Sequence, residues 1–191
     1  LTQQMSWGSL HEGFRLSFFT TENTVRSLVR QMNSLNIDIT DYLLLGKLRL
    51  FPMEVSQSRT ETMEVLLQAI QAEGARGSDM IFIDALTPCI TSSPPEVVLT
   101  FFEKCKRLCS SGITIVLVVH SHAVEKELLV RITSLCDAHL RLRTEEVGER
   151  LIKAMEVAKV RGASKRTGNI ISFEVEPGFG MRIIPINKAQ G

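Results

Sequence analysis

Short apolar segments alternate with amphipathic segments along most of this chain, and this alternation constrains the fold more than any other feature. The segments predicted as strands are Leu16–Thr21, Leu48–Pro52, Met80–Asp84 and Ile113–Val119. Strands that alternate with helices favour an α/β fold with a parallel sheet. The last segment is almost continuously apolar, a pattern typical of a strand whose two faces are both covered by helices.

The segments between these strands have helical periodicity or helix-start signals. Leu1–Glu12 is predicted to be the later part of a helix whose start lies before Leu1. Asn23 or Thr24 is predicted to cap a helix that runs to Ser34. Ser58–Glu61 and Ser93–Glu96 both have capping-box spacing, the second with a proline at the first helical position. These signals predict helices on either side of the sheet.

The character of the chain changes after a short helix predicted near Glu125–Leu135. Four segments joined by polar turns are predicted as strands of an antiparallel meander that completes the sheet: Ala138–Arg143, Leu151–Val160, Asn169–Val175 and Met181–Ile186. Pro177–Ile183 is predicted to contain a glycine-rich hairpin turn. A chain of 191 residues is long enough for a single domain of this kind.

The composition excludes several classes of protein. A formal net charge of +1, with one Trp and one Tyr, gives little material for binding nucleic acid. A hydrophobic fraction of 44% argues against disorder, and four cysteines do not make a disulfide framework. The longest apolar segment is far shorter than the ~20 residues of a membrane-spanning helix. We therefore expect a soluble, cytoplasmic domain.

Polar side chains follow three of the predicted strands. Asp84 ends one strand, Glu22 follows another, and His120 and Ser121 follow the third. The carboxyl ends of parallel strands form the edge at which open α/β sheets bind ligands. Asp84 is suited to hold Mg²⁺ and Glu22 to orient a water molecule. The alternatives are a structural Asp84, a solvated Glu22 in the first turn of a helix, and a zinc site. His120 and His122 are expected on opposite faces of a strand, which disfavours zinc.

Lys159 and Arg161 lie in the most basic stretch, where alternation is expected to place them on one face of a strand. Two such cations suit a phosphate group, although a charged edge strand that prevents aggregation has the same pattern. The sequence contains no G-x-x-x-x-G-K-[ST] phosphate-binding loop.

The sequence resembles the RecA/KaiC-like P-loop proteins, and within them the accessory proteins of the archaeal flagellum (archaellum). The resemblance covers nearly the whole chain. It rests on Phe18–Asn23, Phe82–Pro88 and Val118–His122, and most specifically on the tail from Lys159 to Ile186. It implies a RecA-like three-layer fold over residues 1–191, a single domain that lacks the first strand and the Walker A loop before Leu1.

The resemblance also implies a role for each site residue. Asp84 resembles the Walker B residue that holds Mg²⁺ through water, and Glu22 takes the place of the catalytic carboxylate. The next position is Asn23 where a second Glu is usual, which implies weak or no ATP hydrolysis. His120 and Ser121 match the position that contacts the γ-phosphate. Lys159 and Arg161 resemble a basic pair that reaches the nucleotide of a neighbouring subunit, which implies a homo-oligomer such as a hexamer.

The function implied is an ATP-binding regulatory and assembly component at the cytoplasmic base of the archaellum, peripheral to the cell membrane. Its implied partners are the motor (secretion-type) ATPase and the membrane platform protein, with no direct contact to nucleic acid. Two alternatives stay open: a RecA-like ATPase that handles DNA, and an interaction scaffold that binds no nucleotide.

Overall fold

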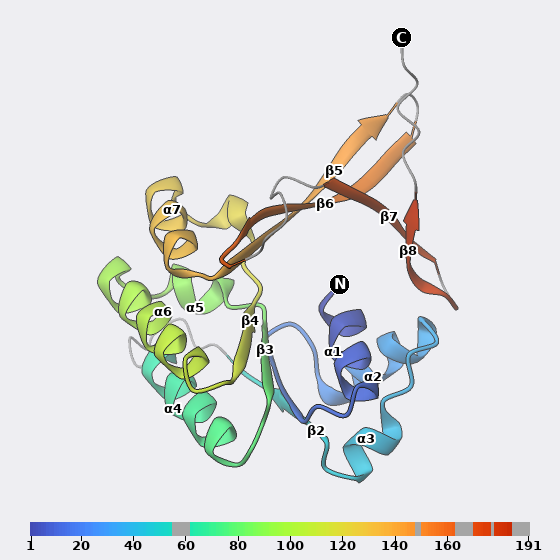
Figure 1. Ribbon diagram of the computed structural model, residues 1–191, viewed down its shortest axis with the longest axis horizontal. Coiled ribbons are helices and arrows are strands. Elements are labelled where there is room, and N and C mark those ends of the chain that lie inside the picture. The colour runs from blue at the N-terminus through green and yellow to red at the C-terminus, as the bar shows by residue number, and fades with distance from the viewer. Residues whose placement is uncertain (55–61, 148–149, 163–169, 177, 185–191) are drawn as a thin grey trace. The chain divides into compact units, whose positions relative to one another are not determined.

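The computed structural model describes residues 1–54, 62–147, 150–162, 170–176 and 178–184 (Figure 1). The chain divides into two compact units, Leu1–Leu135 and Cys136–Gly191. Each unit has its own sheet, and the two are described separately below. Among the described residues, none of the helices has the length and apolar character that crossing a membrane requires.

The first unit is built on a four-stranded parallel sheet. Its strands are β1 (Leu16–Thr20), β2 (Leu48–Pro52), β3 (Met80–Asp84) and β4 (Thr114–Leu117), and their spatial order is β2-β1-β3-β4. The register pairs Leu16 with Met80 and Thr20 with Asp84, so β1 and β3 end level with each other. The parallel sheet with intervening helices confirms the predicted α/β fold.

Helices cover both faces of this sheet (Figure 1). Helices α1 (Thr2–His11), α2 (Val25–Ser34) and α3 (Thr40–Leu44) lie on one face. Helices α4 (Thr62–Ala75) and α6 (Pro95–Cys109) pack together on the other, and α7 (Lys126–Leu135) packs against α6. The short helix α5 (Thr87–Thr91) and the 3₁₀ turn η1 (Ser121–Ala123) follow β3 and β4.

Strand β1 lies inside the sheet, and all five of its residues are buried. Successive side chains of a strand point to opposite faces, so Phe18 and Phe19 enter different cores. Phe18 stacks on Phe82 of β3 with ring centroids 5.7 Å apart, and Phe19 stacks on Phe51 of β2 at 4.8 Å. Burying aromatic rings on both faces explains why this strand is apolar without alternation.

At the amino end of the sheet, a buried carboxylate is fully partnered. Glu73 Oε2 accepts from Ser17 Oγ and from Arg49 Nε, both at 2.6 Å, and Glu73 Oε1 accepts from Arg76 Nη1 at 2.9 Å. Arg49 also donates to Ser78 Oγ at 2.8 Å. Burial alone would raise the pKa of Glu73, but these hydrogen bonds outweigh it and lower the pKa. This network ties α4 to β1 and β2.

The second unit is an antiparallel meander of β5 (Ala138–Val147), β6 (Arg150–Val160), β7 (Ile170–Glu176) and β8 (Gly180–Ile184), in that spatial order. The register shifts between His139 and Leu140, which marks a bulge in β5. Gly178 and Gly180 have φ values of 80° and 74°, a conformation that glycine adopts without strain, so the expected hairpin turn is confirmed.

Three local predictions are wrong. The meander forms a sheet of its own and is not hydrogen-bonded to the parallel sheet among the described strands. Strand β4 is shorter than predicted and lies at an edge of its sheet, with partly exposed side chains instead of two covered faces. The N-cap of α6 is Pro94 with no side-chain hydrogen bond, and Ser93, one residue earlier, makes no capping box. The capping box predicted at residues 58–61 lies outside the described residues.

Candidate functional site

The site lies where β1, β3 and β4 end, at the carboxyl edge of the parallel sheet. These three strands are neighbours, in the order β1-β3-β4. Asp84 is the last residue of β3, Glu22 follows β1, and His120 follows β4. The structure therefore brings Glu22, Asp84 and His120 to one edge, as the sequence predicts. Two carboxylates and an imidazole that converge at one edge are side chains of the kind that ligand-binding sites use.

Glu22 and His120 face each other. His120 Nε2 lies 3.6 Å from Glu22 Oε1, with side chains 45% and 47% exposed. Glu22 precedes the N-cap residue Thr24, whose hydroxyl accepts from the backbone N–H of Ser27. Glu22 is therefore outside the first turn of α2, and the alternative that placed it there is wrong. Both side chains are open to a ligand that enters this edge.

Asp84 is partly buried and is anchored by one of its two carboxylate oxygens. Thr2 Oγ1, at the start of α1, donates to Asp84 Oδ2 at 2.6 Å. A partly buried carboxylate beside a hydroxyl is an oxygen donor set, which Mg²⁺ prefers. Asp84 thus fits a water-mediated Mg²⁺ contact, with Thr2 orienting the carboxylate. Bound there, the ion would neutralise phosphate charge.

Residues 120–122 are not in a strand, so the expectation that His120 and His122 point to opposite faces is wrong. Ser121–Ala123 form the turn η1, and Ser121 is exposed there. The rings of His120 and His122 stack with centroids 5.9 Å apart. In the described ranges, no group of three or more His, Cys, Asp or Glu side chains is arranged to hold a metal ion.

Lys159 and Arg161 belong to the second unit. Lys159 lies opposite His139 in the β5–β6 register. Arg161 comes just after the end of β6, and its guanidinium Nη1 lies 3.3 Å from Asp137 Oδ1. Its backbone N–H donates to the carbonyl of Asp137 at 2.8 Å. The two cations therefore sit at one end of the β5–β6 pair, on a sheet separate from the one that carries Asp84.

Several residues that shape the site were not predicted from the sequence. Thr20 Oγ1 accepts from the backbone N–H groups of Glu22 and Asn23, at 3.3 and 3.2 Å. Thr21 Oγ1 donates to the carbonyl of Ala85 at 2.9 Å and accepts from its N–H at 3.2 Å. Thr87 Oγ1 accepts from the N–H of His120 at 2.8 Å. Threonines that follow strands are a weak signal of such hydrogen bonds.

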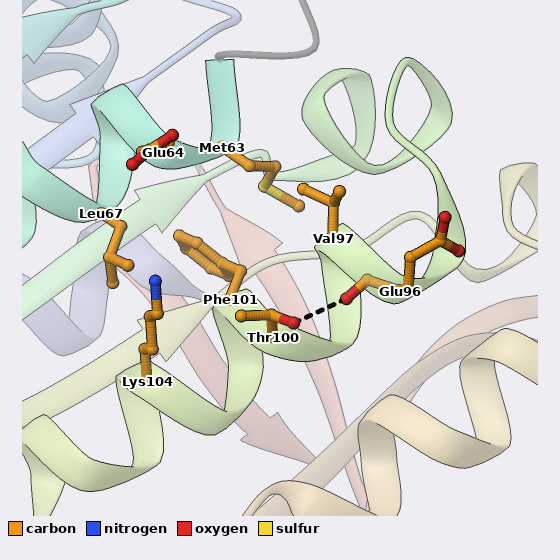
Figure 2. Close-up of a pocket in the computed structure, with 8 residues that line it drawn as sticks. All are labelled: Met63, Glu64, Leu67, Glu96, Val97, Thr100, Phe101 and Lys104. Carbon is orange, nitrogen blue, oxygen red and sulfur yellow. Dashed lines mark hydrogen bonds between the residues drawn. The ribbon is translucent and has the colours of Figure 1, made fainter.

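A separate pocket lies between α4 and α6 (Figure 2). Its volume is about 250 Å³, and it is lined by Met63, Glu64, Leu67, Glu96, Val97, Thr100, Phe101 and Lys104. Its apolar residues Met63 and Phe101 are only 1% and 2% exposed, so they offer little surface to a ligand. None of the predicted site residues lines this pocket.

The fold and this edge define a RecA-like domain. The chain belongs to the KaiC ATPase family, since the family model described as "ATPase: KaiC" matches residues 1–188. This result agrees with the family that the sequence resembles.

Within that family, the chain is similar to proteins named archaeal flagellar ATP-binding protein FlaH. It is 28% identical to the protein from Sulfolobus acidocaldarius over 93% of this chain and 81% of that protein. It is 23% identical to the Methanococcus voltae protein, over 96% and 80% of the two chains.

Two solved structures show the same fold. The crystal structure of flagellar accessory protein FlaH from Methanocaldococcus jannaschii matches with a TM-score of 0.84 at 21% identity, over 97% of this chain and 83% of that one. A KaiC-like protein from Pyrococcus horikoshii matches with a TM-score of 0.72 at 20% identity, over 93% and 80%.

Proposed function

We propose that this chain is an ATP-binding regulatory and assembly component of the archaellum motor complex, active as a nucleotide-dependent ring. The observation that carries the proposal is the convergence of Glu22, Asp84 and His120 at the carboxyl edge of the parallel sheet. Relatives whose alignments cover over nine tenths of this chain are named archaeal flagellar ATP-binding proteins, which supports both the ligand and the cellular setting.

Each predicted residue has a part in this proposal. Asp84 holds Mg²⁺ through water, and Glu22 orients a water molecule near the γ-phosphate. His120 and Ser121 contact the γ-phosphate itself. Position 23 is an amide, which cannot accept a proton as a carboxylate does, so hydrolysis is weak or absent and binding is the main event.

Lys159 and Arg161 serve the ring. In a homo-oligomer, most simply a hexamer, they reach the nucleotide of an adjacent protomer. A triphosphate draws the two cations across the interface, and loss of the γ-phosphate releases them. A coupling free energy of ~1–3 kcal/mol changes affinity ~5–150-fold, which is enough for such a switch. The assembled ring sits in the cytoplasm at the inner face of the membrane. There it docks on the motor ATPase and the platform protein.

The experiment is a thermal-shift titration of the full-length protein, including any residues encoded before Leu1, with ATP and Mg²⁺. At ATP a hundredfold above its dissociation constant, we expect stabilisation by ~2.7 kcal/mol. Native mass spectrometry of the same samples should give rings with ATP and smaller species with ADP. Magnesium without nucleotide is the control. If ATP gives no shift at any concentration, the chain is an interaction scaffold and the proposal fails.

The second candidate, a DNA-handling ATPase, has less support. Single-stranded DNA binds to aromatic side chains in a basic groove, and this chain has one Trp, one Tyr and a net charge of +1. Salt-dependent binding of single-stranded DNA by the full-length protein would favour this candidate over the archaellum role.

A further inference from the structure

The segments that follow β1, β3 and β4 are hydrogen-bonded to one another beyond the last paired residues of the sheet. Val118 donates to the carbonyl of Ile83 at 3.0 Å, and Leu86 donates back to the carbonyl of Val118 at 2.8 Å. On the other side, Thr21 holds Ala85 through both of its backbone groups, at 2.9 and 3.2 Å. The segment after Asp84 is therefore fixed to the β1 side and to the β4 side.

Thr87 makes the last of these links. Its hydroxyl accepts from the backbone N–H of His120 at 2.8 Å, and the residue is only 6% exposed. His120 then turns into η1, where its carbonyl accepts from the N–H of Ala123 at 3.0 Å. The main chain of His120 is thus held at both polar groups, while its ring is 45% exposed and faces Glu22.

We propose that Thr87 is a positioning residue for His120: its hydroxyl fixes the imidazole opposite Glu22 and so sets how well the site distinguishes ATP from ADP. This inference rests on the proposed function. The γ-phosphate is the part that ATP has and ADP lacks, so a displaced His120 weakens ATP binding selectively. Asp84, tied to Thr2 and followed by the Thr21 clamp, keeps its place in a Thr87 variant.

The experiment compares Thr87→Val, which keeps the shape but removes the hydroxyl, with Thr87→Ser, which keeps the hydroxyl. Thr91→Val is the matched control, because Thr91 Oγ1 on the same helix donates to the carbonyls of Thr87 and Pro88 and not to His120. Affinities for Mg²⁺-ATP and Mg²⁺-ADP are measured on the full-length protein. We expect Thr87→Val to weaken ATP binding about fivefold or more, with ADP binding unchanged and both other variants like wild type.

A double-variant cycle separates positioning from general structure. In a His120→Ala background, Thr87→Val should cause no further loss of ATP affinity, because the ring that it positions is gone. A second readout needs no nucleotide: the NMR signals of the His120 ring should move in Thr87→Val and not in Thr87→Ser. If Thr87→Val does not fold, Thr87→Ala serves in the same comparisons.

The outcomes are distinct. If the wild-type protein does not bind ATP, the proposed function fails. If wild type binds ATP and Thr87→Val binds it equally well, or loses ATP and ADP binding equally, the positioning role is wrong. Additive losses in the cycle would also overturn it.

Discussion

Glu22 and His120 meet across the end of β3: Oε1 of the first lies 3.6 Å from Nε2 of the second. The two residues follow β1 and β4, and β3 runs between those strands and ends in Asp84. The short distance therefore shows that the segments after β1 and β4 come together beyond the end of β3. A ligand that enters this edge meets a carboxylate on one side, an imidazole on the other and Asp84 between the two strands.

Asp84→Asn should weaken the Mg²⁺-dependent part of ATP affinity about tenfold, because an amide is a poorer partner for a hydrated cation. The free energy of unfolding should change by less than about 1 kcal/mol, since the side chain is not fully buried. Nucleotide titrations with and without Mg²⁺ measure the first effect. Asp79→Asn, one residue before the other end of β3, is the control and should leave the Mg²⁺ dependence intact.

Replacing both Lys159 and Arg161 with alanine should abolish ATP-dependent ring formation and leave ATP binding by the monomer nearly intact. In the proposed ring both cations contact the nucleotide of a neighbouring protomer. Removing their charge therefore weakens contacts between protomers and leaves the nucleotide contacts within one protomer in place. Native mass spectrometry measures the assembly. Lys153→Ala, an exposed lysine on the same strand, is the control. Rings that form normally in the double variant would show that the pair has no such role.

Glu73→Gln should lower the free energy of unfolding by about 2 kcal/mol at neutral pH, because Arg49 loses the charge of its buried partner. The native pKa of Glu73 lies below its ordinary 4.5, so the unfolded chain takes up a proton first as pH falls. The difference in free energy of unfolding between the wild type and Glu73→Gln is thus complete above pH 4.5 and shrinks as pH falls below it. Urea unfolding of both proteins across this range measures the difference, and a pH-independent difference would contradict it.

His139 should make the second unit sensitive to acid. Burial lowers the pKa of His139 below 6.5. The charges of Arg141 and Lys159 also lower this pKa, while the charge of Glu156 raises it. The native state therefore resists protonation more than the unfolded state, and stability falls as pH drops below 6.5. The protection factors of amides in β5 and β6, which correct for the slower intrinsic exchange at low pH, should fall on acidification. His139→Gln should remove part of this response while leaving exchange at pH above 6.5 unchanged.

Cys89 should be the slowest cysteine to react with iodoacetamide at neutral pH. Burial raises the pKa of its thiol to about 11, so the reactive thiolate is scarce. Cys109 and Cys136 are less buried and should be alkylated before it. Mass spectrometry of timed samples measures the order, and early labelling of Cys89 in the native protein would contradict the expectation.

The sequence was sufficient to predict the strands and the shared edge, because both depend on local pattern and on the rules of parallel sheets. Leu16–Thr21 and Met80–Asp84 are apolar segments bounded by polar residues, and the structure has strands there. The order β1-β3-β4 then places Glu22, Asp84 and His120 together. Both strands are mostly buried, so their apolar composition alone was enough to predict them.

Features that depend on distant partners were not predicted. Thr87 begins α5, and both α6 and β4 lie between it and His120 in the sequence, so nothing local marks its hydroxyl as an acceptor for that residue. The network of Glu73 is of the same kind, since Ser17 and Arg49 come from two strands. The error at Ser93 was local: Pro94 has the extended backbone of an N-cap, so the helix starts without a side-chain cap.

Strand β1 connects two polar networks with opposite exposure. Ser17, near one end, bonds to the enclosed Glu73, and Thr20, at the other, accepts from the N–H of the open Glu22. All five residues of β1, Leu16–Thr20, are buried. A saturation mutagenesis of this strand should therefore find almost no tolerated substitutions, and variants selected there for heat resistance will tend to alter ligand affinity as well.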